Sequence, residues 1–186
     1  TKNCSFWCIV FNSTAIYKKV LKKSRSIISD NFIGLGVGIG AGSKYLQSLL
    51  DSHPDIYMIP GYSLMYFYPH FFENVKTVDN RKNLISVLLD RLPIHNSSLM
   101  PGSESLNKLG SKKNQSLIVE KNNFIEETLF YLRNKRINSR NVLLAFHRAH
   151  YKIFGKRFTN KNSILRPFYH IHDEVFLKYF LSDFPN

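Results

Sequence analysis

Residues 32–55 read FIGLGVGIGAGSKYLQSLLDSHPD, and this stretch decides the predicted fold. The apolar run at residues 31–37 is short and leads into glycine, which is typical of a buried strand. Five glycines lie within residues 34–42, and residues 43–52 then show the spacing of an amphipathic helix. The stretch therefore predicts a strand, a glycine loop and a helix in direct succession.

The apolar residues of the expected helix recur at helical spacing. Tyr45, Leu46, Leu49 and Leu50 fall on one face, which we expect to be buried. Pro54 prevents the helix from continuing, because proline lacks the amide hydrogen and clashes with the preceding turn. The helix is therefore expected to end before Pro54.

The rest of the chain continues this alternation. Strands are predicted at residues 55–59 and 166–172, and helices at residues 79–92 (capped by Asp79), 123–134 (capped by Asn123), 139–154 (ended by Gly155) and from Asp173 onward. Alternating strands and helices predict an α/β domain with a parallel sheet flanked by helices. The whole chain, 1–186, is interpreted as a single domain, and residues 93–116, rich in Ser, Asn, Lys, Gly and Pro, as a long loop or insertion.

Composition narrows the class of protein. A hydrophobic content of 44% with 14% aromatics in 186 residues argues against disorder. The formal charge of +13, from 26 Lys and Arg against 13 Asp and Glu, favours polyanionic partners such as phosphates, sulfates, nucleic acid or an acidic membrane surface. The abundance of Asn, Lys and Ile also fits an AT-rich coding sequence, in which case some surface lysines have no ligand.

The expected location is cytoplasmic, with a lumenal or secretory-pathway location as the alternative. Cys4 and Cys8 form neither a CxxC pair nor a disulfide framework, which favours a reducing compartment. The apolar segment at residues 4–17 is short and is interrupted by Asn12, Ser13 and Thr14, so no stable membrane span is expected.

The glycine loop indicates an anion-binding cradle. In an open α/β sheet, ligands sit beyond the carboxyl ends of the strands, and a helix N-terminus there offers unpaired amide groups and the positive end of its dipole. Glycine lets the backbone turn sharply and lets an anion approach the amides. The alternative is a tight turn without a ligand. The predicted cofactor-binding residues are Gly38, Gly40, Ala41, Gly42, Ser43 and Lys44.

The glycine segment does not match the motifs of two common phosphate-binding loops. A P-loop NTPase needs Gly-Lys followed by Ser or Thr, whereas this chain has Gly42, Ser43 and Lys44 in that order. Of the dinucleotide-binding motif G-x-G-x-x-A, the chain has Gly36, Gly38 and Ala41. The acidic residue that this motif requires after the second strand is missing.

A third comparison extends further. GAGSKYLQSLLDSHPDI at residues 40–56 resembles the opening of sulfotransferases that use 3′-phosphoadenosine 5′-phosphosulfate (PAPS), and HIHDEVFLKYFLSDFPN at residues 170–186 is similar to a later strand and helix of that family. The resemblance implies a P-loop-related, nucleotide-kinase-like fold with PAPS as cofactor. It also implies that the chain is the N-terminal part of such an enzyme, truncated before the strand that carries the Arg of the 3′-phosphate site.

The loop departs from the family pattern G-x-P-(R/K)-S-G-(S/T)-(S/T). Gly42 and Ser43 match, but Gly40 stands where the family has Arg or Lys, Ala41 where it has Ser, and Lys44 where it has a second hydroxyl residue. Two interpretations stay open. Either Lys44 supplies the missing cation from the helix side, or the chain is a degenerate, inactive relative.

Sulfuryl transfer needs a base for the acceptor's proton, and no metal. His70 is the nearest group after the HPD segment suited to accept a proton, and His172, on the segment similar to the family's sulfuryl contact, is the second candidate. Both could instead be structural histidines. A zinc site of His147, His150, His170 and His172 is conceivable, but nothing in their spacing requires it.

The sequence-based hypothesis is therefore a sulfotransferase that moves a sulfuryl group from PAPS to a hydroxyl or amine of a small-molecule or carbohydrate acceptor. The first alternative is a nucleotide-dependent phosphotransferase with a variant phosphate loop. The second is a basic, non-catalytic nucleic-acid-binding module. A nucleic-acid partner is not expected, because neither an RNA-binding aromatic signature nor a basic recognition helix is found.

Overall fold

The computed structural model describes residues 8–10, 31–37, 43–50, 53–59, 64–99, 111–154, 163–169 and 174–185. The chain divides into two compact units. One, the sheet unit, comprises Thr1–Met58 and Phe158–Asn186, and the other, the helical unit, comprises Ile59–Arg157. The prediction that all of these residues form a single domain stays a prediction, and each unit is described here by itself.

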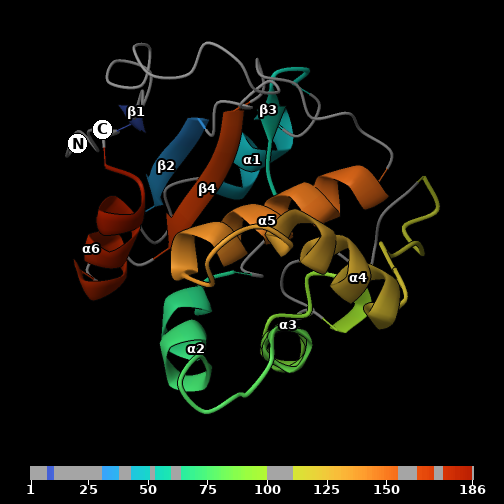
Figure 1. Cartoon of the computed structure of the whole chain (residues 1–186). Helices are drawn as coiled ribbons and strands as arrows, with labels where there is room; N and C mark the ends of the chain where they lie inside the picture. The colour runs from blue at the N-terminus through green and yellow to red at the C-terminus, as the bar shows by residue number, and fades with distance from the viewer. Residues whose placement is uncertain are drawn as a thin grey trace, which may run out of the picture. The chain divides into compact units, whose positions relative to one another are not determined.

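The sheet unit is α/β, as predicted. Its strands are β1 (Cys8–Val10), β2 (Asn31–Val37), β3 (Ile56–Tyr57) and β4 (Ser163–Tyr169), in the order β1-β2-β4-β3. Strands β2, β4 and β3 are parallel, and β1 is antiparallel to β2. β2 and β4 therefore lie side by side although well over a hundred residues separate them in the chain (Figure 1).

Strand β2 has the predicted bounds, and helix α1 (Ser43–Leu50) begins at the predicted residue. The predicted buried face of α1 is wrong in part. Leu46 and Leu50 pack against Leu35 of β2, whereas the side chains of Tyr45 and Leu49 are 69% and 58% exposed. The reason is that the face of α1 toward the sheet is formed by Leu46, Gln47 and Leu50, and helical spacing places Tyr45 and Leu49 outside this face.

Strand β4 begins three residues before the predicted strand and ends at Tyr169. The shift follows from pairing: Ser163 to Tyr169 align with the full length of β2, and Ser163 also pairs with Ile56 of β3. β3 pairs only with the first two residues of β4. Pro167 therefore lies in the part of β4 that pairs with β2 but not with β3. A proline is tolerated there because it lacks the amide hydrogen that a strand with neighbours on both sides would need.

The helical unit contains α2 (Phe67–Asn74), α3 (Arg81–Arg91), a 3-10 turn η1 (Ser97–Leu99), α4 (Lys121–Leu132) and α5 (Ser139–Ile153). Pro69 is tolerated in α2 because it lies in the first turn, where its missing amide hydrogen has no partner to lose. α5 packs against both α4 and α2, while α3 packs against the same two helices. Helix α5 is therefore the central helix of this unit.

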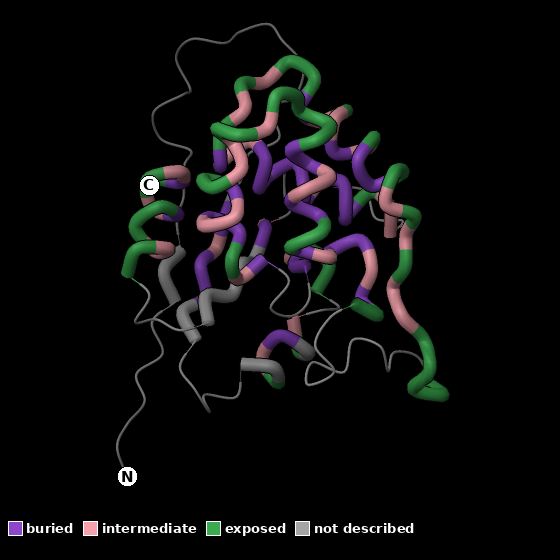
Figure 2. Tube along the Cα trace, turned by 90° about the horizontal axis from the view of Figure 1, so that it is seen from below, coloured by how far each residue is buried: buried purple, intermediate pink, exposed green. Residues whose placement is uncertain are grey.

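Burial explains the central position of α5. Figure 2 shows buried stretches along the described helices, with exposed residues at turns and helix ends. Leu84, Ile85, Leu88 and Leu89 of α3 are buried, as the sequence predicted. The rings of Phe67, Phe124 and Phe146, from α2, α4 and α5, meet at centroid distances of 6.2 and 6.3 Å. The buried residues of α5 are Ser139, Val142, Leu143, Leu144, Ala145, Phe146, His147, Ala149, His150 and Tyr151.

Helix starts differ slightly from the prediction, because the side chains that cap them are different ones. Asn80, not Asp79, caps α3 by accepting a hydrogen bond from the amide of Asn83 at 2.8 Å. Glu120 caps α4 in the same way, and the predicted cap Asn123 is the donor. Several residues near a helix start can cap it, so the sequence locates the start only to within a turn.

The stretch predicted as a loop or insertion, residues 93–116, is partly described. Its beginning is tied to the residues that follow it through a bridge between Asn96 and Ile118. The amide of Ser97 donates to the carbonyl of Leu117, and the amide of Leu117 donates to the Ser97 hydroxyl, each at 2.8 Å. The residues at the beginning of the stretch therefore lie beside those that follow its end, and the interpretation as a loop or insertion stays a prediction.

Candidate functional site

The carboxyl ends of β2 and β4 lie next to each other. The two strands pair in parallel over seven residues, and the last pair joins Val37 to Tyr169. The glycine segment follows directly after Val37 in the chain, and the histidine segment that begins with His170 follows directly after Tyr169. Two stretches that were singled out independently in the sequence therefore leave the same edge of the sheet from adjacent strands.

The helices that follow these two strands cover opposite faces of the sheet. Side chains alternate between the faces of a strand, so Phe32 points to one face and Leu35 to the other. On the Leu35 side, Leu46 and Leu50 of α1 pack together with Ile33.

The opposite face carries helix α6 (Glu174–Asp183). The Phe32 ring lies 5.9 Å from the ring of Phe180 in α6 and 4.2 Å from the ring of Phe184, centroid to centroid. All three aromatic side chains are buried. The chain therefore leaves β2 toward one face of the sheet and leaves β4 toward the other.

This arrangement is a topological switch point. Open α/β sheets bind ligands beyond the carboxyl ends of two adjacent parallel strands whose connections lead to opposite faces. Helix α1 begins at Ser43, after the glycine segment, and carries no acidic residue in its first turn. An anion near this helix start would meet the positive end of the helix dipole and no carboxylate of that turn.

The structure describes only some of the predicted site residues. Ser43 and Lys44 are the first two residues of α1, and their side chains are not among those described. The predicted roles of both residues stay predictions. The predicted residues that lie outside the described part of the chain are Gly38, Gly40, Ala41, Gly42 and His172.

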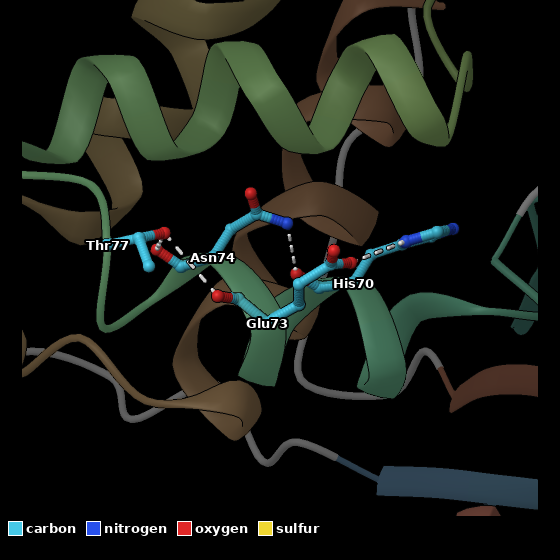
Figure 3. A network of polar contacts seen from close by, with 4 residues as sticks. All are labelled: His70, Glu73, Asn74 and Thr77. Atoms are coloured by element: carbon cyan, nitrogen blue, oxygen red, sulfur yellow. Dashed lines mark hydrogen bonds and ion pairs between the residues drawn. The ribbon is translucent and has the colours of Figure 1, made fainter.

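His70 is the one predicted site residue whose side chain is described. It lies on α2, with a side chain that is 25% exposed, and its Nδ1 atom is 3.8 Å from Oε2 of Glu73 (Figure 3). This distance is too long for a hydrogen bond, so the contact attracts only when the ring is protonated. Asn74 donates from Nδ2 to the His70 carbonyl at 2.7 Å and braces this turn of the helix.

His70 belongs to the helical unit, whereas the switch point belongs to the sheet unit. The side chain is partly exposed, but its Nδ1 atom is buried and has no hydrogen-bond partner among the described residues. A ring nitrogen placed in this way suits proton transfer, but it suits a structural histidine equally well. Its catalytic role therefore stays a prediction.

The histidines of α5 are core residues. His150 lies with its ring 4.5 Å from the ring of Phe154 and 6.4 Å from that of Phe124, and burial lowers its pKa from 6.5 to about 3. His147 is buried on the same helix. Among the residues that the structure describes, no group of three or more His, Cys, Asp or Glu side chains could hold a metal ion. His170 and His172 lie outside that set.

One further histidine was not singled out by the sequence. His95 is buried, and its pKa is lowered mainly by burial and further by the nearby Lys121 cation, against smaller opposing effects of Asp90 and Glu120. Lys121 is itself paired with Asp90, at 2.6 Å. No motif surrounds His95 in the sequence, since the groups around it come from the end of α3 and the start of α4, so no local pattern could have indicated it.

Within the described ranges, none of the helices is both long enough and apolar enough to cross a bilayer. Comparison with known proteins adds no family: no family model, no curated protein and no solved structure matches this chain. The arrangement of β2, β4, α1 and α6 is therefore the observation on which a functional proposal can rest.

Proposed function

We propose that the chain is a PAPS-dependent sulfotransferase of the P-loop-related, nucleotide-kinase-like fold, which transfers a sulfuryl group to a hydroxyl or amine of a small-molecule or carbohydrate acceptor. One observation carries the proposal. The glycine segment and the histidine segment, which resemble two parts of that family, follow adjacent parallel strands at a switch point of the sheet.

The charge at the start of α1 supports an anionic ligand. The first turn of α1 holds Lys44 and no acidic residue, so cation and helix dipole act in the same direction. A nucleotide with a 5′-phosphosulfate is an anion of the size that a glycine loop before a helix accommodates. The residue types at the start of α1 therefore support the group that the resemblance implies.

The bound nucleotide would supply an activated sulfuryl group. The part of the chain would be to hold the 5′ anion with the amides of Gly40 to Ser43 and with the Lys44 ammonium. It would also align the acceptor and remove its proton. His172 is the candidate base on the segment after β4, and His70 is the candidate on α2.

Binding of 3′-phosphoadenosine 5′-phosphate, measured by titration calorimetry with and without Mg²⁺, tests the proposal. We expect binding that does not need the metal, and Lys44→Ala should weaken it about tenfold or more, as expected for a lost charge-assisted contact. Lys178→Ala is the matched control, because Lys178 is an exposed lysine on α6 that pairs with Glu174, at 3.4 Å.

Other outcomes would contradict this assignment. Binding of ATP that depends on Mg²⁺, with none of the 3′-phosphorylated nucleotide, would favour the phosphotransferase. An unchanged affinity in Lys44→Ala would remove Lys44 from the site. Binding without sulfuryl transfer to any acceptor would indicate a degenerate relative that retains only the cradle.

A further inference from the structure

One buried histidine lies where the chain leaves α3 and meets the start of α4. His95 follows the end of α3, is only 7% exposed, and its Nδ1 atom forms no hydrogen bond with any described residue. A polar atom that is buried without a partner costs free energy, so it calls for a physical reason. The ring packs against Phe124 of α4, at 6.4 Å between centroids, and these apolar surroundings favour its neutral form.

The backbone beside this ring joins two distant segments. The His95 carbonyl accepts a hydrogen bond from the amide of Val119 at 2.8 Å. The contact continues through the bridge and the hydrogen bonds of the two following residues. We call this set, residues 95–97 with residues 117–119, the junction pairing. Since Val119 lies directly before the start of α4, a movement of His95 reaches that helix through the junction pairing.

The charged groups around His95 come from both helices. In the described part of the chain they are Lys121, Asp90 and Glu120. Asp90, on α3, pairs with Lys121, on α4, at 2.6 Å and so connects the two helices. Glu120 is occupied with capping α4, because it accepts a hydrogen bond from the amide of Asn123 at 2.8 Å. Asp90 is therefore the carboxylate that can change its partner: its side chain is 64% exposed, and an ion pair at such a position is held only weakly.

Protonation of the ring would change which partner Asp90 prefers. A charged imidazolium has two N–H donors and no acceptor, and a buried charge without a counter-ion is costly. Asp90 can supply this counter-ion, whereas Lys121 repels the new charge. To reach an exposed carboxylate, the ring has to leave its place beside Phe124. Such a movement carries the backbone of residue 95 with it, which weakens the hydrogen bond between its carbonyl and Val119.

We propose that His95 is a pH-sensitive switch: when protonated, it replaces Lys121 as the partner of Asp90 and opens the junction pairing. The neutral form keeps the arrangement that the structure shows, with Asp90 paired to Lys121 and the ring beside Phe124. The opening is local and leaves the core around α5 folded. It goes beyond the proposed sulfotransferase activity and does not depend on it, since every residue involved belongs to the helical unit.

The direction of the pH effect follows from the two states. In the closed state, burial and then the Lys121 cation lower the pKa of His95 from its ordinary value of 6.5. In the open state the ring meets water and the Asp90 carboxylate, so its pKa is not lowered. Because the open state binds the proton more tightly, acid favours opening, and the effect ends once the pH is below the pKa of the closed state. One proton changes the opening equilibrium by about tenfold per pH unit at most.

Amide hydrogen exchange of the isotope-labelled full chain, measured by NMR at pH 7, 6 and 5, tests the proposal. The reporters are the amides of Val119 and Leu117, which form hydrogen bonds within the junction pairing. Corrected for the intrinsic exchange rate, their protection should fall by up to about tenfold per pH unit. His95→Phe keeps a ring beside Phe124 but cannot be protonated, so the protection of both reporters should then be independent of pH.

Further variants separate the switch from general effects. His150→Leu removes the titrating group of the α5 core and should leave the pH dependence of the reporters unchanged. Lys121→Gln removes the competing partner of Asp90, so the reporters should be less protected at pH 7. They should also lose less protection on acidification, because the cation that lowers the pKa of His95 is gone. Lys82→Gln is the matched control, because it breaks a second ion pair between α3 and α4, with Glu126 at 3.1 Å, and should have neither effect.

Three results would overturn the proposal. The first is a pH dependence that is the same in His95→Phe as in the unmodified protein. The second is its disappearance in His150→Leu, which would mean that the reporters exchange only through unfolding of the whole unit. The third is an equal effect of Lys121→Gln and Lys82→Gln. Far-UV circular dichroism would check that each variant folds, and the comparison of the two lysine variants decides the question if His95→Phe does not fold.

Discussion

Lowering the pH should destabilise the helical unit through His150. Its ring lies in the core between Phe124 and Phe154, where burial lowers its pKa from 6.5 to about 3. The folded protein therefore keeps this ring neutral, whereas the unfolded chain protonates it as the pH falls below 6.5. Since the unfolded state then binds more protons, the free energy of unfolding must decrease with falling pH. The decrease ends near pH 3, where both states are protonated.

The size of the effect follows from the two pKa values. An unfolded pKa of 6.5 and a folded pKa of about 3 imply a loss of about 2 kcal/mol between pH 7.5 and pH 5. By pH 3 the loss should reach about 4 kcal/mol. These values are a large fraction of the stability of an ordinary domain. His95, whose pKa is also lowered, contributes in the same direction.

Urea unfolding followed by far-UV circular dichroism at pH 7.5, 6 and 5 would measure this loss. His150→Leu removes the titrating group and should flatten the dependence by about 2 kcal/mol over this range. His53→Gln is the control, because His53 is exposed and lies in the sheet unit. If the unmodified protein and His150→Leu lose the same free energy between pH 7.5 and pH 5, a buried, neutral His150 is not the cause.

Three further tests, each by urea unfolding, probe the packing and the helix capping. Phe32→Ala should cost about 3 to 5 kcal/mol, because it removes the ring that α6 covers; a cost below about 1 kcal/mol would contradict the packing of α6 on that face of the sheet. Asn80→Ala should cost about 1 kcal/mol and Asp79→Ala less, because Asn80 accepts the capping hydrogen bond; the reverse order would favour the cap predicted from sequence. Leu46→Ala should cost at least 1 kcal/mol and Leu49→Ala less than about 0.5 kcal/mol, since only Leu46 packs on the sheet; equal costs would contradict the observed face of α1.

Local pattern was sufficient for much of the fold. The predictions agree to within one residue for the strand at residues 31–37, the helix start at Ser43 and the helix end at Ile153. Apolar runs, helical spacing and proline or glycine stops act within a few residues, so they are readable without the fold. The caps were less certain, because neighbouring polar residues compete for the same amides.

The candidate site was predictable only as separate pieces. The sequence identified a glycine segment and a histidine segment, and the structure shows that the strands before them are neighbours. Gly38, Gly40, Ala41, Gly42 and His172 themselves lie outside the described residues, so their roles stay predictions. His95 could not be identified beforehand, because its environment depends on Asp90 and Lys121 meeting across two helices.

By itself, the sequence determined the alternation of strands and helices, the excess of positive charge and the presence of a glycine-rich segment before a helix. Only the tertiary structure decided that β4 lies between β2 and β3, that α1 and α6 cover opposite faces, and that Arg81 meets the end of α4. The physical reason is the range of the interactions. Helical spacing and turns depend on neighbours along the chain, whereas strand pairing, burial and clustering of charge depend on segments that only the folded chain brings together.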